Sequence, residues 1–305
     1  MAIELLGTLR HRCLQCGGIC HSAVPLRTDE VKGIEKSARK LGISKPIDGD
    51  HLRRIGGKCV FLAKDRRCKL HSRFGAEAKP VICQQFPVVS IRTEDSVRVG
   101  VDPGCLMTSQ SWRDGPELVP DQLLASKVSL PQSAHAAEQE ILDATSVNGQ
   151  TLGGLLAILT GEPSMGGPPA GFAARLAQRV RGSRLAARIR HPDTVLPLRD
   201  VLGGVADRID SLTGPPEWAL GPDEDAFAIE AIRRMVFLRI VHFFPLPLGT
   251  SLVVASGAVL CAWAHPEPEQ FGPAMSAWCR IVRTPEVVAE LVPDPSALQW
   301  LAHGS

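Results

Sequence analysis

The chain has 305 residues, of which 44% are hydrophobic and 22% charged, and this composition is typical of a globular protein that buries a core. It is long enough for one large domain or for two domains of ordinary size. The net charge of +2 gives the whole chain no bias toward nucleic acid or an anionic membrane surface, so we expect neither as a partner.

The two ends of the sequence suggest a compartment. The opening MAIELLGTLRHRC lacks a charged segment followed by an apolar run, and the closing LQWLAHGS has no lipidation motif. We therefore expect a cytoplasmic protein, in which structural disulfides are disfavoured. The longest apolar stretch, residues 245–264, contains two prolines and two glycines, and it predicts a buried core helix rather than a membrane span.

The cysteines divide the chain into two parts. Seven of the nine lie in the first 105 residues, and only Cys261 and Cys279 follow, in apolar surroundings typical of buried side chains. We expect a small irregular cysteine-rich metal-binding domain over residues 1–112 and a mostly α-helical domain over 113–305. The predicted fold class is therefore α+β, mostly helical.

In chain order, the first predicted element is a helix from Thr28 to Leu41, with Thr28 as the N-cap and one apolar face. Two strands are predicted next, Val88–Arg92 and Val97–Val101, on either side of a polar turn. The proline-containing segment 114–132 is expected to wrap around the first domain. Further helices are predicted over 123–128, 134–145, 152–160, 172–190 and 223–244, with a Gly/Pro-rich loop at 161–171.

The segment CLQCGGIC at residues 13–20 is the most distinctive motif. Cys13 and Cys16 have the spacing at which two thiolates from one tight turn reach a single ion, and the glycines that follow let the backbone bring Cys20 inward. Thiolates select zinc or iron–sulfur clusters over magnesium or calcium. A thiol redox pair is the alternative, but that motif follows a buried strand and opens a helix, a pattern that is absent here.

Four more cysteines follow before residue 106. Four thiolates complete a structural zinc site or one cubane cluster, so seven leave spare ligands or suffice for two ions. His21 and His71 stand beside these cysteines, and Cys68-x2-His71 has zinc-ligand spacing. We expect His71 to form hydrogen bonds near the site rather than to bind the metal.

The order of RCLQCGGIC, CVFL and KPVICQQFP resembles the YkgJ-like cysteine-cluster family of zinc- or iron-chelating domains, over about residues 8–112. One position departs from that pattern, because Ile19 stands where the family usually has the first cysteine of a Cys-Cys pair. Carried over by position, the resemblance implies these metal ligands: Cys13, Cys16, Cys20, Cys59, Cys68, Cys83 and Cys105.

The long spacer between Cys68 and Cys83 is similar to that of a branch that includes flagellin lysine-N-methylase. That resemblance implies a 4Fe–4S cluster, S-adenosylmethionine and a protein substrate or partner whose lysines are methylated. The sequence contains no Gly-x-Gly-x-Gly loop after a strand and no Cys-x3-Cys-x2-Cys triplet, so it shows neither a Rossmann methyltransferase nor radical chemistry, and it assigns no catalytic residue. A structural zinc module that supports a protein-interaction surface is the third hypothesis.

Overall fold

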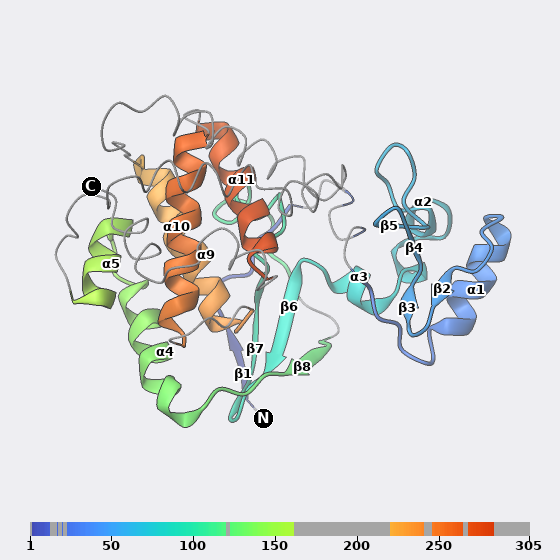
Figure 1. The fold of residues 1–305 in the computed structure, drawn as a ribbon. Helices are drawn as coiled ribbons and strands as arrows, with labels where there is room; N and C mark the ends of the chain where they lie inside the picture. The colour runs from blue at the N-terminus through green and yellow to red at the C-terminus, as the bar shows by residue number, and fades with distance from the viewer. Residues whose placement is uncertain are drawn as a thin grey trace.

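The computed structural model describes residues 2–12, 17, 20, 23–119, 123–161, 220–240, 246–264 and 268–283. These residues form two lobes (Figure 1). The small lobe comprises residues 23–85, against which Cys20 also packs, and the large lobe comprises residues 2–12 and the described residues from 86 onward. Helices and strands are both present, as the predicted α+β class requires.

The small lobe consists of short elements. They are the helix α1 (Val31–Lys40), the paired strands β2 (Ile47–Asp48) and β3 (His51–Leu52), the paired strands β4 (Arg54–Ile55) and β5 (Lys58–Cys59), the helix α2 (Lys69–Phe74), the 3₁₀ turn η2 (Ala76–Ala78) and the helix α3 (Val81–Gln85). Phe61 and Leu70 are buried at the centre of this lobe.

Helix α1 confirms the predicted helix but begins later, at Val31, so the N-cap expected at Thr28 is wrong. The carboxylate of Glu30 takes another role: it accepts hydrogen bonds from the Arg27 amide at 2.8 Å and from the Val81 amide at 2.6 Å. The second bond ties the start of α1 to the start of α3, the helix that carries Cys83.

The large lobe contains a four-stranded sheet with the order β1-β7-β6-β8. Its strands are β1 (Ala2–Leu5), β6 (Val88–Arg92), β7 (Ser96–Val101) and β8 (Ala125–Lys127). β6 and β7 form an antiparallel hairpin that confirms the two predicted strands, while β1 and β8 add at the edges in parallel.

The helix predicted over 123–128 is wrong, because these residues include strand β8. Tertiary contacts decide the outcome: the Leu124 amide donates to the side chain of Gln85, and the Val128 amide donates to the carbonyl of Arg92. Pairing with the free edge of β6 thus outweighs the local helical preference.

In the described part of the chain, five helices pack together, and α9 also contacts strand β7. The helices are α4 (Gln132–Ala144), α5 (Leu152–Thr160), α9 (Pro222–Phe237), α10 (Leu248–Ala264) and α11 (Pro268–Ile281). α4 and α5 agree with prediction, and α10 confirms the buried helix expected over residues 245–264. α9 ends at Phe237, earlier than predicted, and residues 241–245 lie outside the described part, as do the helix predicted at 172–190 and most of the loop at 161–171. Within the described part, no helix is long and apolar enough to cross a membrane.

Helix α10 packs against both α9 and α11 in the core (Figure 1). The fully buried side chains of Ile232 and Met235 line one side of it. On the other side the Trp278 indole donates a hydrogen bond to the Val253 carbonyl at 2.9 Å and lies directly against Gly257. A Cβ atom at Gly257 would approach the indole to 2.0 Å, so this packing requires glycine.

A buried ion-pair cluster joins the helices to the sheet. Arg239, just after α9, donates from Nε and Nη2 to the two carboxylate oxygens of Glu138 on α4, at 2.8 and 3.0 Å. Its Nη1 donates to Glu94 in the β6–β7 turn and to the Val128 carbonyl, both at 2.9 Å. Burial raises the pKa of Glu94, but the hydrogen bond from Arg239 and further hydrogen bonds outweigh it and lower the pKa to about 2.

Replacing Arg239 by methionine should lower the free energy of unfolding by about 3 kcal/mol, because Glu138 and Glu94 would lose the guanidinium that pairs with both, and Glu138 would keep only its ion pair with Arg98. Urea denaturation measures the change. Arg233→Met is the matched control: Arg233 is a third exposed and 3.8 Å from Glu230, so its loss should cost less than about 1 kcal/mol. Equal losses in the two variants would contradict the assigned role of Arg239.

Candidate metal centre

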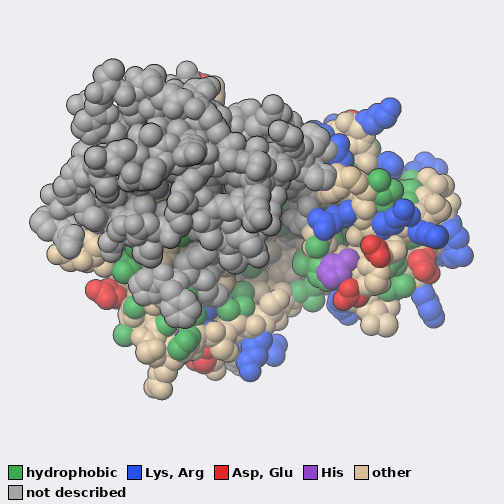
Figure 2. Space-filling model, in the orientation of Figure 1, with side chains coloured by type: hydrophobic (Ala, Val, Ile, Leu, Met, Phe, Trp, Pro, Cys, Tyr) green, Lys and Arg blue, Asp and Glu red, His purple; other side chains and the backbone are tan. Residues whose placement is uncertain are grey.

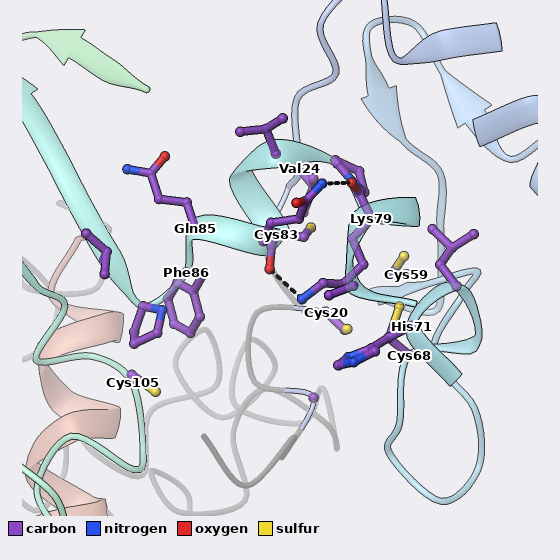
Figure 3. Close-up of a pocket in the computed structure, with 18 of the residues that line it drawn as sticks. Cys20, Val24, Cys59, Cys68, His71, Lys79, Cys83, Gln85, Phe86 and Cys105 are labelled. Atoms are coloured by element: carbon purple, nitrogen blue, oxygen red, sulfur yellow. Dashed lines mark hydrogen bonds between the residues drawn. The ribbon is translucent and has the colours of Figure 1, made fainter. Parts of the chain in front are cut away.

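A cavity of about 540 Å³ lies where the two lobes meet, lined by residues of both. Five of the seven predicted ligands line it: Cys20, Cys59, Cys68, Cys83 and Cys105 (Figure 3). The other two, Cys13 and Cys16, lie outside the described residues, as does His21. The fold therefore brings cysteines that are up to 85 residues apart in the sequence to the same cavity.

Short local structures present four of these cysteines from the small-lobe side of the cavity. Cys59 ends strand β5, Cys68 is the N-cap of α2, and Cys83 lies within α3. Cys20 follows a tight turn in which its amide donates to the Gly17 carbonyl at 2.9 Å. Gly17 has φ +70°, and a Cβ atom there would lie 2.6 Å from the Arg66 carbonyl oxygen, so this turn needs glycine.

The four thiols influence one another electrostatically. Burial raises the pKa of Cys83, and the nearby Cys20 and Cys59 raise it further. Burial likewise raises the pKa of Cys59 to about 11, with a contribution from Cys68. Ionising all four thiols in this space without a counter-charge would be costly, and a bound metal cation removes that cost.

The sulfur-bearing side chains of the four small-lobe cysteines line one cavity. In the described part of the chain, no three His, Cys, Asp or Glu side chains are close enough together to hold one ion. Sulfur ligands of one tetrahedral zinc lie about 3.8 Å apart, since each Zn–S bond is about 2.3 Å.

Lys79 and His71 also line the cavity, and sequence reasoning assigned a role only to His71. The Lys79 ammonium donates a hydrogen bond to the Cys83 carbonyl at 3.0 Å, and its charge lowers the pKa of the Cys83 thiol against the stronger effect of burial. A cation at this position offsets part of the negative charge that several thiolates would bring.

Cys105 lies apart from the other four cysteines, on the large lobe (Figure 3). Its amide donates to the Asp102 carbonyl at 3.1 Å. The Asp102 carboxylate accepts two hydrogen bonds from the Arg283 guanidinium, of which the one from Nη1 is 3.1 Å long. Arg280 donates a hydrogen bond of 2.6 Å to the Gly104 carbonyl. The end of helix α11 and the residues just after it therefore fix the turn that carries Cys105.

Sequence reasoning missed His11, which contacts Cys105: the His11 Nε2 lies 3.9 Å from the Cys105 Sγ. Burial, aided by the positive charge of Arg234, lowers the pKa of His11 to about 4, so its imidazole is neutral at pH 7. The only available signal in the sequence was its position two residues before Cys13.

Cys261 and Cys279 lie far from this cavity in sequence and are fully buried in the helical core, as predicted. Burial raises the pKa of Cys279 to about 12 and that of Cys261 also rises, which leaves both as inert thiols.

Residues 12–105 match the model of the CxxCxxCC family, described as a putative zinc- or iron-chelating domain. This part of the chain is similar to a known cysteine-cluster family. The match supports the resemblance to a cysteine-cluster family of zinc- or iron-chelating domains, and it does not test the YkgJ name or the methylase branch. No curated protein and no solved structure matches the chain.

Replacing Gly17 by alanine should weaken metal binding by the cysteine-cluster domain. The added Cβ would collide with the Arg66 carbonyl oxygen and would lie 3.0 Å from the Leu62 side chain. In addition, the positive φ costs about 1–2 kcal/mol for a residue that has a side chain. Because the Cys20 amide bonds to Gly17, the strain would displace Cys20. Metal content after purification measures the effect.

Gly33→Ala in α1 is the matched control, since a Cβ atom there meets nothing within 4 Å. Alanine should raise stability by up to about 1 kcal/mol at this helical position and leave the metal content unchanged. If both glycine variants retained full metal, the turn at Gly17 would not position the site.

Proposed function

We propose that the cysteine-cluster domain binds an iron–sulfur cluster through Cys20, Cys59, Cys68 and Cys83, with Cys13 and Cys16 as further candidate ligands. The observation that carries this proposal is the convergence of four thiols on one cavity of about 540 Å³. Four thiolates complete the coordination of one cubane cluster, and the seven cysteines of the N-terminal region exceed what one structural zinc needs.

The chemistry of the donors fits that group. The four side chains are all soft thiols, which select iron–sulfur clusters or zinc. The Lys79 ammonium near Cys83 and the backbone hydrogen bond from Phe61 to the Cys59 thiol would offset part of the charge of the thiolates. An iron–sulfur cluster bound here would supply electron transfer or Lewis acidity, and the chain's own residues would set its solvent access and charge.

Anaerobic purification tests the proposal by the visible absorption spectrum and by the content of iron, zinc and acid-labile sulfide. We expect a brown protein with iron and sulfide. Cys83→Ser should lower the metal affinity at least tenfold, because it removes a thiolate from the cavity.

Cys261→Ser, in the helical core, is the control and should retain the full metal content. A colourless protein with zinc and no sulfide would rule out the cluster and favour the structural zinc module. Equal metal loss in the Cys83 and Cys261 variants would show that the loss reflects unfolding rather than a lost ligand.

A catalytic role is the second candidate: S-adenosylmethionine-dependent methylation of protein lysines, as the resemblance to flagellin lysine-N-methylase implies. The size of the cavity favours it, because about 540 Å³ lies in the range of small-molecule sites. Beyond the thiols, the walls include the apolar side chains of Phe86, Met107 and Leu118. A small molecule would therefore find apolar contacts beside the metal centre.

The charge distribution favours an acidic protein as the substrate. The small lobe, residues 23–85, carries 15 of the chain's 34 Lys and Arg and 7 of its 32 Asp and Glu, so its net charge is +8 while the rest of the chain is −6. Lys and Arg side chains cover much of its visible surface (Figure 2). Among the described residues, no aromatic side chain is a large exposed hydrophobic group, so the lobe offers no stacking platform for bases.

Calorimetry tests the catalytic candidate. Titration of S-adenosylmethionine into the metal-loaded full-length protein should release heat with one site per chain. The Cys83→Ser variant is the control, and its heat should fall because the metal centre forms one wall of the cavity. No heat with metal-loaded wild-type protein would overturn the catalytic candidate and leave metal binding intact.

A further inference from the structure

The two walls of the cavity differ in their chemistry. The small-lobe wall includes two cations, Arg66 and Lys79, and no Asp or Glu is among the described residues that line the cavity. The large-lobe wall includes the apolar side chains of Phe86, Met107 and Leu118. In Figure 3, Lys79 lies among the small-lobe cysteines, and Phe86 lies toward the large lobe. A molecule in the cavity would therefore meet positive charge on one side and apolar surface on the other.

Arg66 is an exposed cation whose backbone is strained. Its φ is +67°, in a region that favours glycine and that costs energy for a residue with a Cβ atom. The neighbouring Asp65 carboxylate accepts a hydrogen bond from the Arg67 amide at 3.1 Å, and no described carboxylate forms an ion pair with the Arg66 guanidinium. A strained residue at the wall of a cavity is often kept for what its side chain binds.

Lys79 has donors to spare. Its ammonium carries several N–H groups, and among the described residues it donates to a single neutral acceptor, the Cys83 carbonyl at 3.0 Å. The carboxylate of Glu77, two residues earlier, lies against Gly75. Because Lys79 is half-buried, its attraction for an anion is less weakened by water than that of a fully exposed lysine. Lys79 can thus bind an anion and keep its hydrogen bond to the backbone.

We propose that the cavity binds a small organic anion that has an apolar body and a carboxylate or phosphate group. The anionic group would contact Arg66, whose planar guanidinium matches such oxygens in pairs, and Lys79. The apolar body would lie against Phe86, Met107 and Leu118. Small-molecule sites combine mostly apolar walls with a few polar groups in this way. The inference names the ligand class of the same cavity, and it rests on the proposed function in that the ligand would lie beside the metal centre.

Fluorescence titration of the metal-loaded full-length protein tests the proposal with two probes. The first is 8-anilinonaphthalene-1-sulfonate, an apolar ring system with an anionic group, and the second is N-phenyl-1-naphthylamine, the same ring system without that group. We expect one site per chain. The anionic probe should bind at least about tenfold more tightly, because it alone forms charge-assisted hydrogen bonds with the two cations.

Substitutions in the two walls should separate charge from apolar contact. Arg66→Gly removes the guanidinium and suits the positive φ, so the variant should fold and bind the anionic probe at least about tenfold more weakly, with the uncharged probe unaffected. Lys79→Met should act in the same direction. Met107→Ser should weaken both probes. Arg67→Met is the matched control, because Arg67 is the next residue and does not line the cavity.

Competition identifies the anionic group. Octanoate and octyl phosphate share an apolar chain and differ in that group, so the one that displaces the anionic probe at the lower concentration shows whether the site prefers a carboxylate or a phosphate. Displacement by neither would overturn the proposal. So would equal affinity for the two probes, full affinity in the Met107 variant, or an equal loss in the Arg66 and Arg67 variants, which would reflect the general charge of the small lobe.

The metal content of each protein separates this proposal from the proposed function. Metal-loaded protein that does not bind the anionic probe would overturn the anion site and leave the metal centre standing. Protein that binds the probe with the expected selectivity but contains no metal would do the reverse. If Lys79→Met loses its metal, Arg66→Gly decides, because its backbone conformation favours glycine.

Discussion

The fold depends on the buried guanidinium of Arg239, which joins the end of α9, helix α4, the β6–β7 turn and the end of β8. A charge at this depth is tolerated only when its donors are paired, and here Glu138, Glu94 and a backbone carbonyl pair with it. These partners are more than 100 residues away in the sequence, so the cluster forms only when sheet and helices come together. The sheet is thereby fixed against the helices. The opposite end of the same hairpin leads to α3 on one side and to the Cys105 turn on the other.

The cavity follows from this arrangement. The large lobe presents His11 and Cys105 from backbone segments held by hydrogen bonds and by the Asp102–Arg283 ion pair. The small lobe presents its cysteines from strands of two residues and helices of five or six, which bury little apolar surface of their own. Small domains of this kind commonly draw part of their folding free energy from a bound metal. The metal centre would then stabilise the lobe that holds it.

Local pattern was sufficient to predict the elements whose environment is simple. Alternating apolar residues predicted β6 and β7, and helical periodicity predicted α4 and α5. Long-range partners decided the rest. Contacts with Gln85 and pairing with β6 make residues 125–127 a strand. Helix α9 ends just before Arg239, which adopts φ 46° and donates to Glu138. Five of the seven cysteines predicted as metal ligands line the cavity, whereas His11 became visible only through its contact with Cys105.

The net charge of the whole chain likewise hides how the charges are distributed between its parts. A sum of +2 suggests no preference for a partner, yet it combines a small lobe of +8 with a remainder of −6. Charges act over a screening length of about 8 Å at physiological salt, so an approaching molecule responds to the lobe nearest to it and not to the sum. The cavity opens beside the basic lobe, with Arg66 and Lys79 among the residues that line it. Under the proposed function, the field of the basic lobe would draw an acidic protein segment toward the place where the thiols converge.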